Sequence, residues 1–424
     1  MDTSEFRRVI TNGLGRATLW VRDNPWRPHE EAITNVCLHN TAYDAQCEGS
    51  RAEYAYEIVL RTDSLDHFSE IAATGLMASQ EFFDTSHLFS LNRLFAQAGF
   101  ARSRDALYEK FRKGDAEERS IGAEEFVKLD GMNGVLFVLD QIGGWMDRGT
   151  GYHEDDYFLQ ETQRALGPEV ISSLREAARS NSNIHRYIEE VERTMQRRSK
   201  QPRTDYRSFT YQQMRDLILS THGDVTRTWL FFWGKSAPDD CIRMAARDLL
   251  MEQDDALLAA YLRIFSHRAF PLDIKRMIDL ALSTNKDVAS AARRSLRLLR
   301  SDAIHALAVD IIQRGGDHPE GSIPLLIKNY REGDHLLIES LMDASANEDD
   351  FHCVAYDSLD VFAANPQAQA LGSLIKIYEN CRCSNCRSGA VKILADRRIL
   401  SPPIREECKY DSHEGTREIA RLAN

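Results

Sequence analysis

A repeated spacing of alanine and leucine is the feature that most restricts the fold of this chain. Segments that begin at Asp240, Asp287 and Asp350 each carry alanine five residues later and leucine nine residues later. Asn385 begins a further copy, and Asp317 begins a degenerate copy with serine in place of alanine. Positions five and nine share one face of a helix, and a small residue there lets a neighbouring helix approach closely. The alanines that we expect at helix contacts are Ala245, Ala292, Ala355 and Ala390.

A second helix is predicted after each of these first helices. Residue types that commonly cap helix N-termini lie 14 to 17 positions after the repeat starts. These residues are Asp254, Ser301, Asp334, Asn365 and Ser401. Pro366 and Pro402 follow two of them, at the first helical position, where a missing amide hydrogen costs nothing. Because apolar residues at helical spacing follow each cap, the sequence predicts an all-α protein in which antiparallel helix pairs repeat as an α-solenoid.

This arrangement resembles a HEAT-repeat array. The resemblance covers roughly 236–424, and the final segment SHEGTREIARLAN resembles a truncated last repeat. It implies a curved stack of helix pairs and is compatible with several activities, because HEAT-like proteins include scaffolds, bilin lyases, DNA glycosylases and a metal-dependent hydroxylase. A fold that serves so many functions does not select one of them.

The N-terminal half also has helical periodicity, but it does not follow the repeat. Amphipathic segments with suitable caps predict helices within 51–62, 66–78, 85–99 and 103–114. A glycine-dense passage at 131–151 is interpreted as an irregular connection around one buried helix. The predicted organisation is a helical N-terminal region with irregular connections, a basic linker with a connecting helix, and the HEAT-like repeats, at 1–195, 196–235 and 236–424.

The basic linker is the first candidate binding segment. It carries six basic residues against the single acid Asp205: Arg193, Arg197, Arg198, Lys200, Arg203 and Arg207. A solvated helix end that runs into a linker explains such a run, and a docking site for phosphate or an acidic partner is the alternative. Seven positions after the repeat starts lie Arg247, Arg294, Pro324, Asp357 and Lys392. Since a phosphate track along stacked repeats needs one sign of charge, this mixed row argues against nucleic acid.

Composition narrows the class of protein. The formal net charge of −12 argues against a protein that coats nucleic acid or an anionic membrane, and a hydrophobic fraction of 43% supports a folded core. No apolar run approaches the length of a membrane span, and the N-terminus lacks the layout of a signal peptide. Eight scattered cysteines in an acidic chain are typical of reduced thiols. We therefore expect a cytoplasmic protein.

The cysteines near the C-terminus raise the sharpest chemical question. Cys386 lies on the same helical stripe as Ala390, and Cys408 lies on the corresponding stripe of the following helix, so we expect the two to be close. Cys383 precedes Cys386 by one turn. Zinc needs a fourth ligand, and the nearest candidate is His413. Simple packing of buried thiols is favoured, with a redox pair or a zinc site formed by Cys383, Cys386 and Cys408 as the alternatives.

No catalytic or cofactor site emerges from the remaining residues. The segment 43–59 clusters acids around Arg51, and helical ion pairing explains this without catalysis. We therefore predict a non-enzymatic HEAT-repeat scaffold or adaptor without a cofactor. It is expected to bind another macromolecule, and a protein is the favoured partner. The alternatives are a nucleic-acid-binding protein that uses the basic linker, and a helical enzyme with a site in the N-terminal half.

Overall fold

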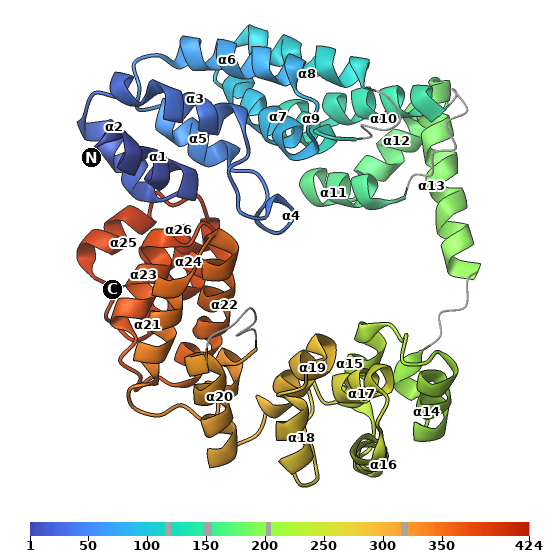
Figure 1. Cartoon of the computed structure of the whole chain (residues 1–424). Helices are drawn as coiled ribbons and strands as arrows, with labels where there is room; N and C mark the ends of the chain where they lie inside the picture. Colours follow the sequence, from blue (N-terminus) through green and yellow to red (C-terminus); the bar gives the residue numbers. More distant parts are fainter. Residues whose placement is uncertain (115–119, 147–154, 201–204, 315–320, 424) are drawn as a thin grey trace. The chain divides into compact units, whose positions relative to one another are not determined.

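The computed structural model of the chain consists of helices and the turns that join them (Figure 1). The structure describes residues 1–114, 120–146, 155–200, 205–314 and 321–423. No β-strand occurs within these ranges, so the all-α prediction is confirmed for them. None of their helices combines the length and the apolar character that crossing a bilayer requires.

The chain divides into two compact units. Unit 1 comprises Met1–Pro202, Arg382–Asn385 and Ser401–Asn424, and unit 2 comprises Arg203–Cys381 and Cys386–Leu400. Unit 1 therefore contains both ends of the chain. The last segment, which the sequence analysis groups with the repeats, belongs to unit 1.

Unit 1 is formed by short and medium-length helices. They are α1 (Thr3–Asn12), α2 (Gly15–Asp23), η1 (Arg27–His29), α3 (Glu30–Leu38), α4 (Ala45–Glu48), α5 (Ala52–Val59), α6 (Leu65–Ala78), α7 (Phe82–Gln97), α8 (Ala101–Lys113), α9 (Ala123–Asp130), α10 (Met132–Met146), α11 (Tyr157–Leu166), α12 (Val170–Ala178), α13 (Ser182–Lys200), α25 (Pro402–Cys408) and α26 (Glu414–Leu422). The four helices predicted in the N-terminal half are confirmed as α5 to α8. Helices α6, α7 and α8 pack against one another, and α10 packs against α9 and α13.

The described part of the glycine-dense passage forms a regular helix from Met132 to Met146. Helix α10 contains the buried helix predicted at 135–140, but it also runs through the flanking glycines, so the irregular connection expected around that helix is wrong for 132–134 and 141–146, while 147–154 lies outside the described residues. A Cβ atom on Gly143 would lie 2.0 Å from the carbonyl oxygen of Asn183 in α13. A Cβ atom on Gly134 would lie 2.0 Å from the carbonyl oxygen of Phe126 in α9. These glycines therefore permit close helix packing instead of breaking the helix.

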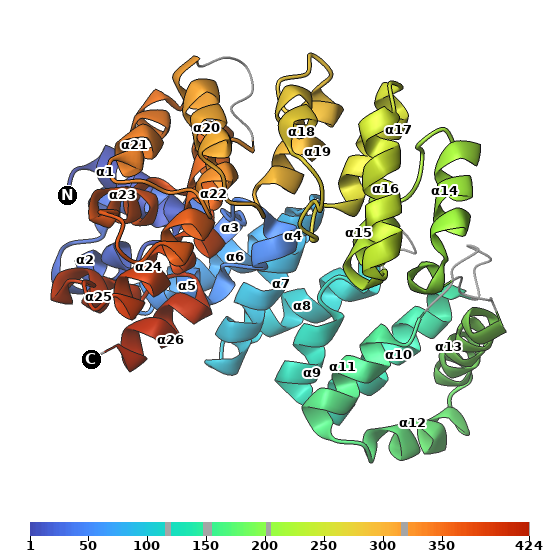
Figure 2. The same ribbon diagram turned by 90° about the horizontal axis from the view of Figure 1, so that it is seen from below.

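Unit 2 contains most of the predicted repeats. Its elements are η2 (Tyr206–Ser208), α14 (Tyr211–Ser220), α15 (Arg227–Ser236), α16 (Asp239–Met251), α17 (Asp255–Ile264), α18 (Lys275–Leu280), α19 (Lys286–Leu296), α20 (Asp302–Arg314), η3 (Ile323–Leu326), α21 (Asp334–Ala344), α22 (Glu348–Ala364), α23 (Leu371–Asn380) and most of α24 (Ser384–Asp396). Successive helices follow one another from α14 to α20 (Figure 2). The four repeat alanines are fully buried, as expected: Ala245, Ala292, Ala355 and Ala390.

The packing differs from the predicted repeat phase at two places. Helix α17 packs against both α15 and α19, so the second helix of the first predicted pair lies beside the first helix of the next. The additional helix α18 lies between them in the sequence and accounts for the 47 positions that separate the repeat starts Asp240 and Asp287. Asp254 caps α17 as predicted, by accepting from the amides of Ala256 and Leu257. Asn365 does not begin a helix, because it is the C-terminal cap of α22, and α23 begins at Leu371.

Replacing Ala292 with leucine is expected to lower the free energy of unfolding by about 1 to 3 kcal/mol, because the added methylenes overpack the interior side of α19. Ala292 has no exposed surface. Thermal and urea unfolding of the full chain measure the effect. The matched control is Ser290→Leu, an exposed position on the same helix. A variant Ala292→Leu that melts like the control would contradict tight packing around α19.

Candidate functional site

The described residues of the basic linker are divided between the two units. In helix α13 of unit 1, Arg193 makes an ion pair with Glu190 at 2.5 Å, and Arg198 makes one with Asp155 at 3.4 Å. Arg197 is exposed. This part of the segment is a solvated helix end, as the favoured interpretation of the sequence has it.

The remaining linker residues lie after α13 or at its end. The side chain of Lys200 and the whole of Arg203 are outside the described residues. Arg207 belongs to η2 in unit 2, and its guanidinium carbon lies 4.6 Å from the ring centre of Phe232 on α15. Arg207 therefore adds a positive charge beside α15, which itself carries Arg227 and Lys235.

Three adjacent helices of unit 2 carry a cluster of positive charge, which we call the basic face. Helices α15, α17 and α19 lie side by side (Figure 1). On α15, Arg227, Phe231 and Lys235 are spaced four residues apart and so share one side of the helix. The basic face consists of Arg227, Lys235, Arg263, Arg294 and Arg297, with the imidazole of His267 among them.

The charges of the basic face act on one another. Burial lowers the pKa of Arg263, and the positive charges of Arg227 and Arg294 lower it further, against the opposing charge of Asp287. Burial also lowers the pKa of His267, and Arg297, Lys235 and Arg294 add to the effect. The side chains on the three helices are therefore close enough to repel one another.

The arginines at the centre of the basic face have little compensation. Arg227 has an ion pair with Asp287 at 3.8 Å, and both side chains are exposed. Among the described acids, none forms an ion pair with Arg263, Arg294 or Arg297. The Nε atom of Arg297 is also buried without a hydrogen-bond partner among the described residues. Such an arrangement favours an external anion, since guanidinium groups bind phosphate and carboxylate oxygens in pairs.

An acidic residue borders the basic face on α22. Burial raises the pKa of Asp357 to about 6, and the charge of Asp360 acts in the same direction. The amide of Gly321 and the charges of Arg297 and Arg294 oppose this rise. The positive charge therefore diminishes at the part of α22 that carries Asp357.

Aromatic rings accompany these charges. The ring of Phe231 makes an edge contact with His267 at 5.5 Å between centres, and Tyr206 stacks on Trp229 at 3.6 Å. Aromatic surfaces next to cations are typical of proteins that bind single-stranded nucleic acid.

The structure changes the argument drawn from the mixed row of repeat positions. Because α17 packs against α19, the neighbour of Arg294 is Arg263 and not the predicted Arg247. Positive charge predominates from α15 to α19, where Asp287 is the acid paired with Arg227, and Asp357 follows on α22. The sequence signal that could have revealed the basic face is the spacing of its basic residues by three, four or eight positions, as in Arg294 and Arg297, Arg263 and His267, and Arg227 and Lys235.

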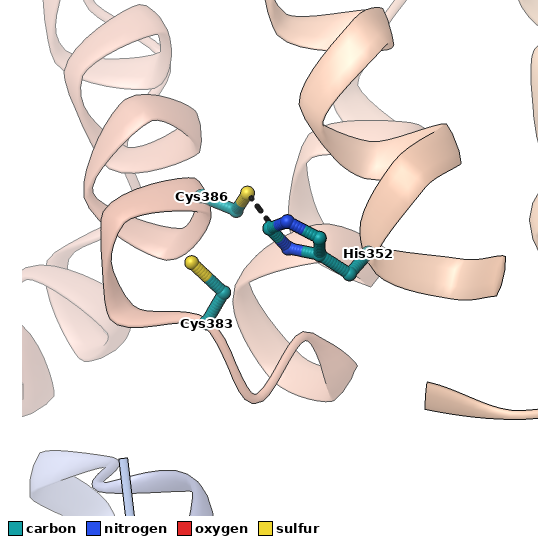
Figure 3. Close-up of side chains that lie close together, drawn as sticks. All are labelled: His352, Cys383 and Cys386. Atoms are coloured by element: carbon teal, nitrogen blue, oxygen red, sulfur yellow. Dashed lines mark hydrogen bonds between the residues drawn. The ribbon is translucent and has the colours of Figure 1, made fainter. Parts of the chain in front are cut away.

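A second candidate site joins one histidine to two of the predicted cysteines. Cys383 and Cys386 are buried at 5% and 1% exposure, at the start of α24. Nδ1 of His352, from α22, lies 3.5 Å from Sγ of Cys386. One donor atom from each of the three residues lies within 4.8 Å of the others (Figure 3). Sequence analysis missed His352, although it lies about one repeat length before Cys386.

The other members of the predicted cysteine site lie elsewhere. Cys408 is fully buried in unit 1. Its predicted proximity to Cys386 stays a prediction. His413, the expected fourth zinc ligand, is the N-terminal cap of α26, where its Nδ1 accepts from the amide of Thr416 at 3.2 Å. Within the described part of the chain, His352 is therefore the histidine that accompanies the two cysteines.

A polar cavity of about 370 Å³ in unit 1 is a third feature. It is lined mainly by charged and hydroxyl side chains, which include Glu48, Arg51, Arg93, Glu125, Lys128 and Arg417. Arg51 pairs with Glu48 at 3.1 Å, as the spacing predicts, but the pair bridges the turn between α4 and α5 and does not lie within one helix. Glu125 pairs with both Arg93 and Lys128. The charges of this cavity largely compensate one another, in contrast to those of the basic face.

No protein-family model, curated protein or solved structure matches this chain.

Proposed function

We propose that unit 2 is a HEAT-like helical repeat that binds the phosphate backbone of a nucleic acid through the basic face. The observation that carries this proposal is the group of arginines that form no ion pair with any described acid, Arg263 on α17 and Arg294 and Arg297 at α19. Partly buried cations that repel one another reduce the stability of the folded protein. A bound polyanion removes that repulsion and supplies the missing hydrogen bonds.

The extent of the basic face favours a polymer over a single phosphate. Adjacent packed helices are about 8 to 10 Å apart, so the charges on α15, α17 and α19 span several phosphate groups of one strand. Phe231 lies within this row and offers an aromatic edge to a base. The acidic remainder of the chain restricts such binding to this face.

The test measures the binding of labelled single-stranded and double-stranded oligonucleotides to the full chain by fluorescence anisotropy across a range of salt concentrations. We expect affinity to fall steeply with salt. Neutralising a phosphate contact in Arg263→Gln or Arg294→Gln should reduce the slope of log affinity against log salt by about 1. The control is Arg314→Gln on α20, an exposed arginine that is paired with Asp310.

Two outcomes would contradict the proposal. The first is the absence of oligonucleotide binding at low salt. The second is binding that Arg314→Gln weakens as much as Arg294→Gln does, because the contact would then depend on net charge alone. Either result would favour the protein adaptor that the sequence predicts.

A further inference from the structure

We propose that His352, Cys383 and Cys386 form a zinc site with three protein ligands and a fourth coordination position open to water. The site is independent of nucleic-acid binding, since none of its residues belongs to the basic face. Its ligands come from α22 and from the start of α24, and Figure 3 shows the imidazole turned toward the two sulfur atoms.

The distances fit one metal ion. A sulfur and a nitrogen that bind the same tetrahedral zinc at ordinary bond lengths are about 3.6 Å apart. The distance between Sγ of Cys386 and Nδ1 of His352 is 3.5 Å. Two sulfurs on one zinc are about 3.8 Å apart. All three donor atoms here lie within 4.8 Å of one another. Side-chain rotations that move these atoms by about 1 Å therefore bring them to the separations found on zinc.

The positions of the two cysteines follow from local helix geometry. Cys383 immediately precedes α24, and Cys386 lies in its first turn. Residues three apart at a helix start face the same side. The amide groups of the first turn also stabilise negative charge, which favours the thiolates that bind a metal.

The donor set selects the metal. Two thiolates and an imidazole suit zinc, whereas magnesium and calcium prefer oxygen ligands. His352 binds through Nδ1, which leaves Nε2 protonated. Both cysteines are buried and His352 is only partly so, which makes the histidine the most exposed of the three ligands. Within the described residues, no fourth histidine, cysteine or carboxylate joins the group. Three protein ligands with water as the fourth are the arrangement of reactive zinc sites.

Elemental analysis tests this proposal on the full chain, purified under reducing conditions without a metal-affinity tag. We expect one equivalent of zinc per chain in the wild type. Cys386→Ser and Cys383→Ser should lose it, and His352→Ala should bind zinc at least tenfold more weakly in a competition with a chromogenic chelator. The controls are Cys353→Ser, next to His352 on α22, and Cys241→Ser on α16. Both should keep the full equivalent.

Cobalt substitution provides a second readout that does not depend on how well the variants fold. Cobalt added to the metal-free wild type should give sulfur-to-cobalt charge-transfer absorption of the intensity expected for two thiolates. A reduced wild type that takes up neither zinc nor cobalt would overturn the proposal and leave packed thiols. A disulfide between Cys383 and Cys386 in the freshly isolated protein would overturn it in favour of a redox pair. Equal loss of zinc in Cys353→Ser would show that the ligands are wrongly assigned.

Discussion

Replacing Arg51 with alanine should lower the free energy of unfolding by about 3 to 5 kcal/mol, the largest effect that we expect from one substitution. The ion-paired side chains of Arg51 and Glu48 are only 5% and 1% exposed. Arg51 also donates to the carbonyl oxygens of Thr11 at 2.6 Å and Arg382 at 3.0 Å. Its removal leaves the Glu48 carboxylate buried without its cation and releases two segments that are distant in the sequence.

The electrostatics of Glu48 support this expectation. Burial by itself would raise its pKa, but the charge of Arg51 and the hydrogen bonds from Ser384 and from the amide of Asp44 lower the pKa overall. The carboxylate therefore remains charged inside the protein, where an unpaired charge is most costly.

Urea unfolding followed by tryptophan fluorescence measures the loss. The double variant Arg51→Met, Glu48→Leu removes both charges and should recover part of the stability, because no buried charge is then left unpaired. The control is Arg179→Ala, which breaks an exposed pair with Glu176 and should change little. If Arg51→Ala costs no more than the control, the buried pair does not stabilise unit 1.

Acidification from pH 7 to about 4 should destabilise the protein by about 3 kcal/mol through His87 alone. His87 is completely buried, its Nε2 lies 3.1 Å from the carbonyl oxygen of Val36, and its Nδ1 lies 3.2 Å from the hydroxyl of Ser50. Burial lowers its pKa to about 4 from the ordinary value of 6.5. The ring is therefore neutral in the folded protein at pH 7, and it fits as the tautomer that donates from Nε2.

The direction in which stability changes with pH follows from proton binding by the folded and the unfolded chain. Above about pH 6.5, both the folded and the unfolded chain carry a neutral His87, so the full stability is present. As the pH falls below 6.5, the unfolded chain takes up the proton first, and stability is lost until the folded protein is also protonated near pH 4.

The measurement compares the pH dependence of urea unfolding in the wild type and in His87→Gln, whose side chain cannot titrate. We expect a shallower dependence between pH 6.5 and pH 4 in the variant. His67→Gln is the control, since His67 is partly exposed and paired with Glu30. An unchanged slope in His87→Gln would show that His87 is not the group that links acid to unfolding.

The sequence by itself determined the local features of this protein. Helical periodicity predicted an all-α chain, and four of the N-terminal helices fall where the pattern indicated. The repeated alanines are buried, and Asp254 caps its helix. Each of these features depends on residues within about four positions of one another, so helix geometry is sufficient to predict them. The ion pair between Glu48 and Arg51 was also expected from the spacing, but it bridges the turn between α4 and α5 instead of lying within one helix.

Only the tertiary structure decided which helices meet. The glycines of α10 suggested an irregular segment because glycine weakens an isolated helix. In the structure a Cβ atom at Gly134 or Gly143 would lie 2.0 Å from a carbonyl oxygen of the neighbouring helix, so glycine is necessary at these positions. The repeat phase differed because a periodic pattern does not specify whether α16 or α17 packs on α19. That packing brings Arg263 to Arg294, and the meeting of α22 with α24 brings His352 to Cys386. Such contacts between distant segments depend on helix packing, which local spacing does not encode.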